Sequence, residues 1–176
     1  MVVSYKDRKR HCGKNEAVHF FLNDFEYRDA VWCNLERTTY SLNKFDYLFT
    51  PDLSQWRDLP TDFYNRMNVF RSRFIGAYWQ KCGFKVIPTA SWGDLSSFVY
   101  CFEGLPKHSV IAVSGMGNRK NADAFNRWCY GLRRLEEAKV PTKILVYGDE
   151  VEVQGLHTEI KFIPCFIQKR LRKLCR

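Results

Sequence analysis

The sequence lacks the long apolar run that a membrane-spanning helix needs. Its 176 residues contain no uninterrupted apolar stretch of the roughly 18 residues that cross a bilayer. The first fourteen residues are rich in charge, where a secretory signal would carry its apolar segment. We therefore expect a soluble, cytoplasmic protein that does not contact a membrane.

Motifs of the common metal and hydrolase sites are also absent. No two of the seven cysteines lie within four residues of each other, which excludes CxxC and zinc-ribbon spacings. The four histidines form neither HxH nor HExxH, and no serine stands in GxSxG. We expect reduced cysteines that fill the core as small apolar groups.

What the sequence does contain is typical of a folded domain. Hydrophobic residues make up 45% of the chain and charged residues 27%, a balance that excludes disorder and low-complexity polymers. A chain of this length can bury one hydrophobic core without disulfides or metals. The expectation is a single domain.

Six short, nearly continuous apolar runs are bounded by turn residues, as in strands buried on both faces. They cover residues 17–22, 45–50, 84–89, 110–114, 143–147 and 159–163. Between them, residues 59–78, 95–102 and 122–135 have apolar side chains at helical spacing, residues 25–42 are less regular, and a last helix follows Pro164.

This alternation predicts an α/β fold with an open, mostly parallel sheet of five to six strands flanked by helices, in a single domain. A closed barrel of eight units needs roughly 250 residues and does not fit this length. The connection before residues 159–163 is short for a helical crossover. The last strand therefore pairs either in parallel or as an antiparallel edge.

The net charge of +9 is concentrated at the two ends. Residues 1–14 carry five basic side chains and one acidic one, residues 161–176 carry six basic and no acidic ones, and the rest is close to neutral. We divide the chain into a basic N-terminal extension (1–14), an α/β domain (15–163) and a basic C-terminal helix (164–176).

Basic clusters attract polyanions because bound cations release counterions from the phosphates. This predicts binding of DNA or RNA by Lys6, Arg8, Lys9, Arg10, Lys169, Arg170, Arg172 and Lys173. One alternative is that short basic tails only aid solubility. A basic helix on a membrane surface is the least favoured alternative, because its apolar residues would equally dock it on the core.

Aspartates end four of the five loops that follow the predicted strands. Ligands collect at the carboxyl ends of parallel strands, so Asp52, Asp94 and Asp149 are the candidate catalytic residues, as Mg²⁺ ligands or as acid/base groups. The alternative is that aspartate is favoured at helix N-caps and in turns, which accounts for Asp94 and Asp52 without any chemistry. We assign no metal ligand.

The loop after residues 110–114 is the most distinctive one. Its glycines allow close backbone approach and two cations follow, so it fits phosphate or another anion. The predicted anion-binding residues are Ser114, Gly115, Gly117, Arg119 and Lys120. The loop matches neither GxGxxG nor a P-loop, and the alternative is a tight turn between strand and helix.

Aromatic side chains provide another possible contact with nucleic acid, because unpaired bases stack on them. Most of them are expected in the core, since Trp79 and Trp128 lie on or beside helical apolar stripes. Trp56 and Trp92 lie in loops that leave the sheet and are the candidates for stacking.

Several segments resemble the hallmark blocks of a known family. They are FTPDLSQWRDLP, RFIGAYWQKCGFKVIPTASWGD, SFVYCFEGLPKHSVIAVSGMGNRKNADAF and KILVYGD. The similarity is to a family called domain of unknown function 4417, which occurs in bacteriophages, prophages and plasmids. It runs from about Phe20 to Gly148 and leaves both basic ends outside.

The resemblance implies a context more than a mechanism, and it assigns no catalytic residue to this sequence. It suggests work on nucleic acid, on replication or transfer of the mobile element, or on host defence. Our leading hypothesis is an accessory protein that binds DNA, RNA or a nucleic-acid-loaded complex such as an RNA-guided nuclease, and inhibits host defence in the manner of an anti-CRISPR or anti-restriction protein.

The rival hypothesis is a metal-dependent phosphoesterase or nuclease. It would use Asp52, Asp94 and Asp149, and Mg²⁺ would then be the cofactor. The leading hypothesis is a binding protein and not an enzyme. It implies no cofactor. A virion or scaffold protein is a weaker third reading, because the sequence shows no oligomerisation patch.

Overall fold

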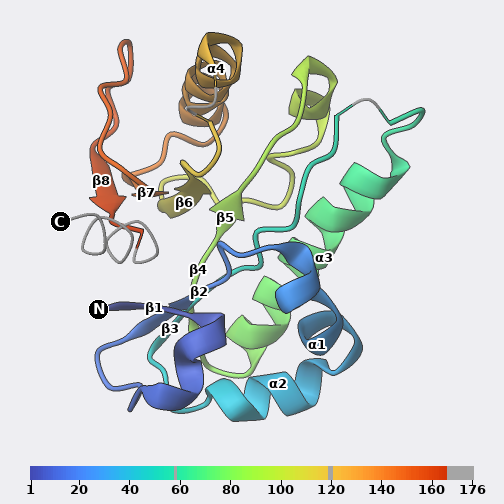
Figure 1. Ribbon diagram of the computed structural model, residues 1–176, viewed down its shortest axis with the longest axis vertical. Helices are drawn as coiled ribbons and strands as arrows, with labels where there is room; N and C mark the ends of the chain where they lie inside the picture. The colour runs from blue at the N-terminus through green and yellow to red at the C-terminus, as the bar shows by residue number, and fades with distance from the viewer. Residues whose placement is uncertain (58, 119–120, 166–176) are drawn as a thin grey trace, which may run out of the picture. The chain divides into compact units, whose positions relative to one another are not determined.

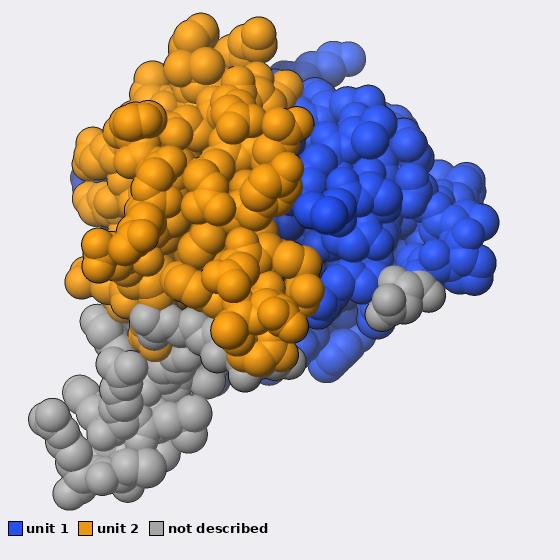
Figure 2. Space-filling view, turned by 90° about the horizontal axis from the view of Figure 1, so that it is seen from above, with its two compact units in different colours: residues 1–105 blue, residues 106–176 orange. Residues whose placement is uncertain are grey.

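The computed structural model describes residues 1–57, 59–118 and 121–165. The chain forms two compact units, Met1–Leu105 and Pro106–Arg176, which are coloured separately in Figure 2. Among the described helices, none is both long and apolar enough to cross a bilayer.

The first unit is built on a parallel sheet (Figure 1). Its register aligns Val18 with Leu48 and Leu48 with Val86. Val18 and Leu48 are completely buried, as expected for the middle of a sheet that is covered on both faces. The strands, paired in chain order, are β1 (Val2–Ser4), β2 (Ala17–His19), β3 (Tyr47–Phe49) and β4 (Lys85–Ile87).

Three α-helices pack against this sheet and contribute residues to one hydrophobic core. The indole ring of Trp79 lies 5.5 Å from the ring of Phe20, and its N–H donates to Thr39 Oγ1 at 2.9 Å. The α-helices are α1 (Arg28–Cys33), α2 (Leu35–Leu42) and α3 (Phe63–Lys81). The 3-10 helices are η1 (Tyr5–Arg10), η2 (Asp24–Glu26) and η3 (Leu95–Val99).

Pro88 lies between β4 and β5 (Thr89–Ala90) and has no backbone N–H to donate. At this point, side-chain hydrogen bonds take the place of bonds between backbone groups. The N–H of Thr89 donates to Thr50 Oγ1 at 2.8 Å, and Thr89 Oγ1 donates to the carbonyl of Thr50 at 2.9 Å. Helix α3 crosses this point closely, because a Cβ on Gly76 would lie 2.7 Å from Thr50 Cγ2. Glycine is therefore needed at the crossing.

The second unit combines parallel strands with a long helix. Strands β6 (Val110–Ser114), β7 (Lys143–Tyr147) and β8 (Ile160–Ile163) pair in this order, and α4 (Ala122–Lys139) connects β6 to β7. Asn121 caps α4 by accepting from the N–H of Ala124 at 2.8 Å. The buried residues of this unit include Ile111, Val113, Leu132, Leu135, Ile144 and Val146.

These elements confirm the predicted α/β class. The predicted strand number is wrong, because the described residues hold eight short strands in two four-stranded sheets. The prediction contains no counterpart of β1, and β8 pairs parallel to β7 rather than as an antiparallel edge. The predicted helix over residues 95–102 is the shorter 3-10 helix η3.

The division into extension, domain and C-terminal helix stays a prediction. Strand β1 and helix η1 occupy the predicted N-terminal extension and belong to the first unit. The predicted C-terminal helix lies outside the described residues from position 166 onward.

We expect Gly76→Ala to destabilise the protein although alanine is the better helix former. The added methyl meets Thr50 Cγ2, and overpacking of this kind costs about 1–3 kcal/mol, which exceeds the roughly 1 kcal/mol that alanine gains in a helix. Urea unfolding followed by circular dichroism measures the change.

A second substitution isolates the cause. Thr50→Ser removes the opposing methyl and keeps the hydroxyl, so Gly76→Ala should cost less in a Thr50→Ser background than in the wild type. An equal cost in both backgrounds would show that this close approach is not what requires glycine.

Candidate functional site

Helix α3 turns its aromatic stripe outward and its uncharged polar side chains inward. Phe63 is 69% exposed, Phe70 54% and Phe74 46%. On the opposite side of the helix, Asn65 and Asn68 are buried. The predicted apolar stripe of this helix is thus an exposed surface of the first unit.

The inward polar side chains hold the loop that follows β3. Asn65 accepts from the N–H of Trp56 at 2.8 Å and donates to its carbonyl at 2.7 Å. Asn68 donates to the carbonyl of Ser54 at 2.8 Å, and Ser72 donates to the carbonyl of Pro51 at 2.8 Å. A loop without regular structure needs such partners for its backbone groups. The helix supplies them, which leaves its aromatic side chains on the outside.

The exposed surface carries positive charge as well as rings. The α3 face consists of Trp32, Arg66, Phe70, Arg71 and Phe74. The ring of Trp32 meets the rings of Phe70 and Phe74 edge-on at 6.3 and 5.8 Å, and the guanidinium of Arg71 lies 5.3 Å from the Trp32 ring centre. Helix α3 contains four basic residues and no acidic one. Arg66 pairs with Asp62 at 3.6 Å, and the half-buried Arg71 donates to Asn68 Oδ1 at 3.2 Å. The α3 face is therefore aromatic, with a small excess of positive charge.

An apolar hollow lies at the start of the same helix. Its cavity volume is about 580 Å³. Trp56, on its rim, is 53% exposed, and Arg28 donates to Tyr64 Oη at 3.4 Å. We call it the Trp56 hollow, and it is lined by Trp56, Leu59, Pro60, Thr61, Phe63 and Tyr64.

Two aspartates meet at the carboxyl ends of β2 and β3. Asp24 accepts from the N–H of Ser54 at 3.2 Å and from its hydroxyl at 3.0 Å, while Tyr27 Oη donates to the carbonyl of Asp52 at 2.6 Å. Asp52 Oδ1 is buried and accepts no hydrogen bond from the described residues. Burial, assisted by the negative charge of Asp24, raises the pKa of Asp52 to about 7 against the opposing effect of Arg73.

Arg73 has a structural role beside this pair. Its guanidinium donates to the carbonyls of Thr89 at 2.8 Å, Cys101 at 3.0 Å and Glu103 at 2.9 Å. Burial lowers the pKa of Arg73 to about 10. Through these three hydrogen bonds, Arg73 links α3 to β5 and to the segment that follows η3.

The other predicted catalytic aspartates have different settings. Asp94 is exposed and accepts from Ser96 Oγ at 2.7 Å at the start of η3, whereas Asp149 follows β7 in the second unit. Within residues 1–57, 59–118 and 121–165, no group of three or more His, Cys, Asp or Glu side chains could hold a metal ion. The structure therefore brings Asp52 together with Asp24.

The predicted anion loop uses part of its hydrogen-bonding capacity internally. The N–H of Gly115 donates to the carbonyl of Tyr147 at 2.8 Å, and the N–H of Met116 donates to Ser114 Oγ at 3.2 Å. Gly117 adopts the left-handed conformation, with φ of +76°. Arg119 and Lys120 lie outside the described residues.

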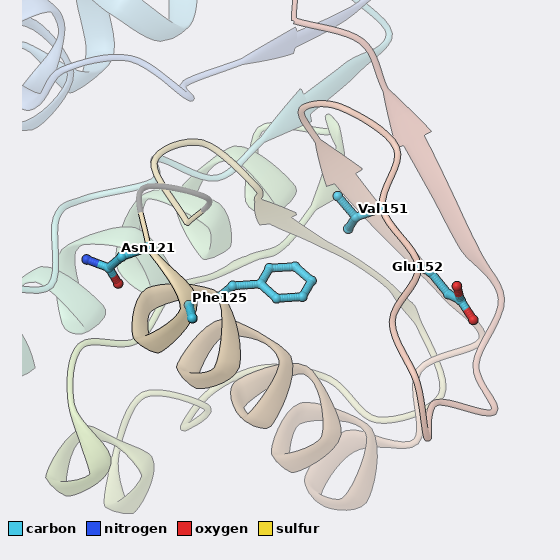
Figure 3. Close-up of a pocket in the computed structure, with 5 residues that line it drawn as sticks. Asn121, Phe125, Val151 and Glu152 are labelled. Atoms are coloured by element: carbon cyan, nitrogen blue, oxygen red, sulfur yellow. The ribbon is translucent and has the colours of Figure 1, made fainter.

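The lining of the pocket beside this loop includes a carboxylate. Its cavity of about 440 Å³ is lined by Asn121, Ala122, Phe125, Val151 and Glu152. In Figure 3 the ring of Phe125 points from α4 toward the segment that carries Val151 and Glu152. The carboxylate of Glu152 disfavours a negatively charged ligand, and Asn121 already caps α4.

Most of the predicted basic residues of the N-terminal segment have partners in the first unit. Lys6 Nζ lies 2.7 Å from Glu26 Oε1, and Arg10 lies 3.5 Å from Asp7. The guanidinium of Arg8 lies 3.7 Å from the Tyr5 ring centre and donates to the carbonyl of Tyr5. Lys9 is exposed. The predicted C-terminal residues Lys169, Arg170, Arg172 and Lys173 lie outside the described part.

The two candidate stacking tryptophans differ in accessibility. Trp56 is exposed, whereas Trp92 is half-buried against Phe98 and Phe102, with ring centres at 6.4 and 6.0 Å. Sequence reasoning missed the outward direction of the α3 stripe. The available signal was the row of uncharged Asn65, Asn68 and Ser72 on the other side, since a solvent-facing row usually carries charge.

We expect the free energy of unfolding to fall as the pH rises from about 4 to about 7. The pKa of Asp52 is raised above its ordinary value, so the folded state holds a proton that the unfolded state has lost. One such proton gives a slope approaching about 1.4 kcal/mol per pH unit. Denaturation of the wild type and of Asp52→Asn across this range measures the effect.

The Asp52→Asn variant should show a flatter profile. Asp24→Asn should move the decline to lower pH, because it removes the like charge that raises the pKa of Asp52. Identical profiles for the wild type and Asp52→Asn would contradict this assignment.

Comparisons with known proteins place the chain in a family. The model described as Domain of unknown function (DUF4417) matches residues 1–163. The match includes the basic N-terminal segment, so the expectation that this segment lies outside the family is wrong. No solved structure matches the chain.

Two similar proteins come from mycobacteriophages. The Gene 1 protein of Mycobacterium phage L5 is 40% identical over 155 residues, which cover 88% of this chain and 67% of that protein. The Gene 1 protein of Mycobacterium phage D29 is 35% identical over 159 residues, which cover 90% of this chain and 58% of that protein. The chain thus spans 58% and 67% of the length of these relatives. It belongs to the family described as Domain of unknown function (DUF4417), and its relatives include phage proteins.

Proposed function

We propose that the first unit binds nucleic acid on the α3 face. The observation that carries this proposal is the composition of the outward side of α3, where exposed phenylalanines lie beside Arg66 and Arg71 and the helix contains no acidic residue. Aromatic rings offer stacking surfaces for bases, and arginines contact phosphates.

The exposed rings support a binding role on energetic grounds. A soluble chain rarely leaves a connected apolar patch in water unless the patch contacts a partner. Phe70 and Phe74 are about half exposed although they lie 5.8 Å apart and both contact Trp32. The adjacent Arg71 favours a partner that carries negative charge.

The relatives give the proposal its biological setting. A phage protein acting in the host cell meets DNA, RNA and defence complexes loaded with nucleic acid. Binding to such a complex, and inhibition of host defence through it, remain predictions from the sequence. The exposed Lys9 and the C-terminal cations would add to the attraction of a polyanion.

A second candidate function is acid/base cleavage of a phosphodiester by the Asp24 and Asp52 pair. A buried carboxyl with a pKa near 7 is typical of a proton donor or acceptor, and the pair lies at the strand ends where ligands collect. The Mg²⁺-dependent form would need ligands beyond this pair. Asp52→Asn should then abolish cleavage of a labelled oligonucleotide while circular dichroism stays unchanged. Full cleavage by the variant would contradict this candidate.

The binding proposal predicts a specific loss of affinity. Replacing Phe70 and Phe74 together by alanine should weaken binding of a fluorescein-labelled oligo(dT) at low salt by about tenfold or more, since each stacked base contributes about 1–3 kcal/mol. Fluorescence anisotropy measures the affinity. Tyr40→Ala is the matched control, because Tyr40 is a 79% exposed aromatic residue on α2 outside the α3 face.

The salt dependence of binding tests the contribution of the basic side chains independently. Arg66→Gln should reduce the slope of log affinity against log salt by about 1 if Arg66 contacts a phosphate, whereas Lys107→Gln, at an exposed lysine of the second unit, should leave it unchanged. A wild-type protein that binds neither single-stranded nor duplex nucleic acid at low salt would refute the proposed function.

A further inference from the structure

Resting on the nucleic-acid binding proposed above, we propose that the Trp56 hollow holds one base turned out of the strand. The protein then prefers single-stranded to duplex nucleic acid, because a base in a duplex must first be unstacked and unpaired to enter.

The walls of the hollow suit a flat aromatic ligand. Pockets that bind small ligands typically enclose about 300–1,000 Å³ and combine apolar walls with a few polar groups. The volume of about 580 Å³ falls in this range. Trp56, Phe63 and Tyr64 supply rings, while Thr61 and Tyr64 supply hydroxyls for the edge of a base.

Trp56 is held in place although its ring is exposed. Asn65 is buried and uses its amide group on both the N–H and the carbonyl of Trp56. The loop thus has a fixed position while the indole ring faces solvent. A binding surface that is preorganised in this way loses little conformational entropy when a ligand stacks on it.

The hollow continues into the α3 face along the helix. Phe63 lines the hollow, and Phe70 and Phe74 follow it on the same side of α3. Eleven residues of α-helix span about 16 Å, which is long enough for bases next to the inserted one to stack on the same row. The hollow and the row of rings therefore lie on the same side of α3.

The charge around the hollow favours a nucleic acid over an apolar peptide. Arg28 donates to Tyr64 of the hollow and pairs through Nε with Asp29 at 3.0 Å, and the exposed Arg57 follows Trp56 directly. Arg57 forms no ion pair with the described carboxylates. An inserted base brings a phosphate on each side that these guanidinium groups can contact, whereas an apolar peptide brings none.

The test compares single strands with duplex in matched variants. Fluorescence anisotropy of a labelled twelve-nucleotide oligo(dT) and of a labelled hairpin duplex is measured with the wild type, Trp56→Ala, Trp56→Phe and Tyr40→Ala. We expect Trp56→Ala to weaken oligo(dT) binding about 5- to 100-fold, in line with the loss of one stacked base. Duplex binding should change less than twofold, Trp56→Phe should restore most of the affinity, and Tyr40→Ala should have no effect.

A backbone probe separates base contacts from phosphate contacts. An oligonucleotide of abasic sites keeps the phosphates but has no bases to stack. It should bind the wild type weakly, and Trp56→Ala should not change its affinity. Equal losses for oligo(dT) and duplex, or an undiminished affinity of Trp56→Ala for oligo(dT), would overturn the inference while leaving nucleic-acid binding intact. Absence of binding by the wild type to every probe would instead refute the proposed function on which it rests, and would favour an apolar protein segment as the occupant.

Discussion

The inward row of amide and hydroxyl groups on α3 determines most of what is distinctive about the first unit. Asn65, Asn68 and Ser72 bond the backbone of the loop after β3, which has no strand or helix partner of its own. A buried carbonyl or N–H left without a partner costs about 1–3 kcal/mol. These bonds therefore decide which side of α3 faces the interior.

If hydrophobic burial alone decided the orientation of α3, its phenylalanines would face the interior. The first half of α3 has its large apolar residues on one side, and burying a phenylalanine gains about 1.5–3 kcal/mol. Each loop backbone group left without a partner costs a comparable amount, and the inward side of α3 supplies partners for four of them. Further along, the order returns to the usual one, since Ile75 and Trp79 are buried in the core. The helix is thus a core element at its end and a loop support at its start.

This reversal shows where prediction from the sequence succeeds and where it fails. Strands β6 and β7 were predictable to the residue because Val110–Ser114 and Lys143–Tyr147 are continuous apolar runs between turns. Strand β1 was not, since Val2–Ser4 is too short for a pattern and precedes a basic segment. The α3 face was not predictable from periodicity, because a hydrophobic pattern gives the spacing of a stripe and leaves open what packs on the opposite side.

The candidate aspartates illustrate the same limit. That aspartates follow the strands was visible in the sequence, and strand order does bring Asp24 and Asp52 to neighbouring strand ends. Asp52 Oδ1 is buried, Tyr27 binds the backbone carbonyl of Asp52, and the charge of Arg73 opposes the rise of its pKa. These groups come from distant parts of the chain. A local sequence motif therefore cannot predict the burial of this carboxyl.

The loop of residues 50–57 links the two features to which functions are assigned. It begins with Thr50, which is bonded to Thr89, and ends near Trp56, which is bonded to Asn65. Asp52 lies between these fixed points. Because both ends are anchored by buried side chains, the loop moves as one piece with α3 and the sheet edge. The same buried anchors thus keep both the Trp56 ring and the Asp52 carboxyl in fixed positions on one short loop.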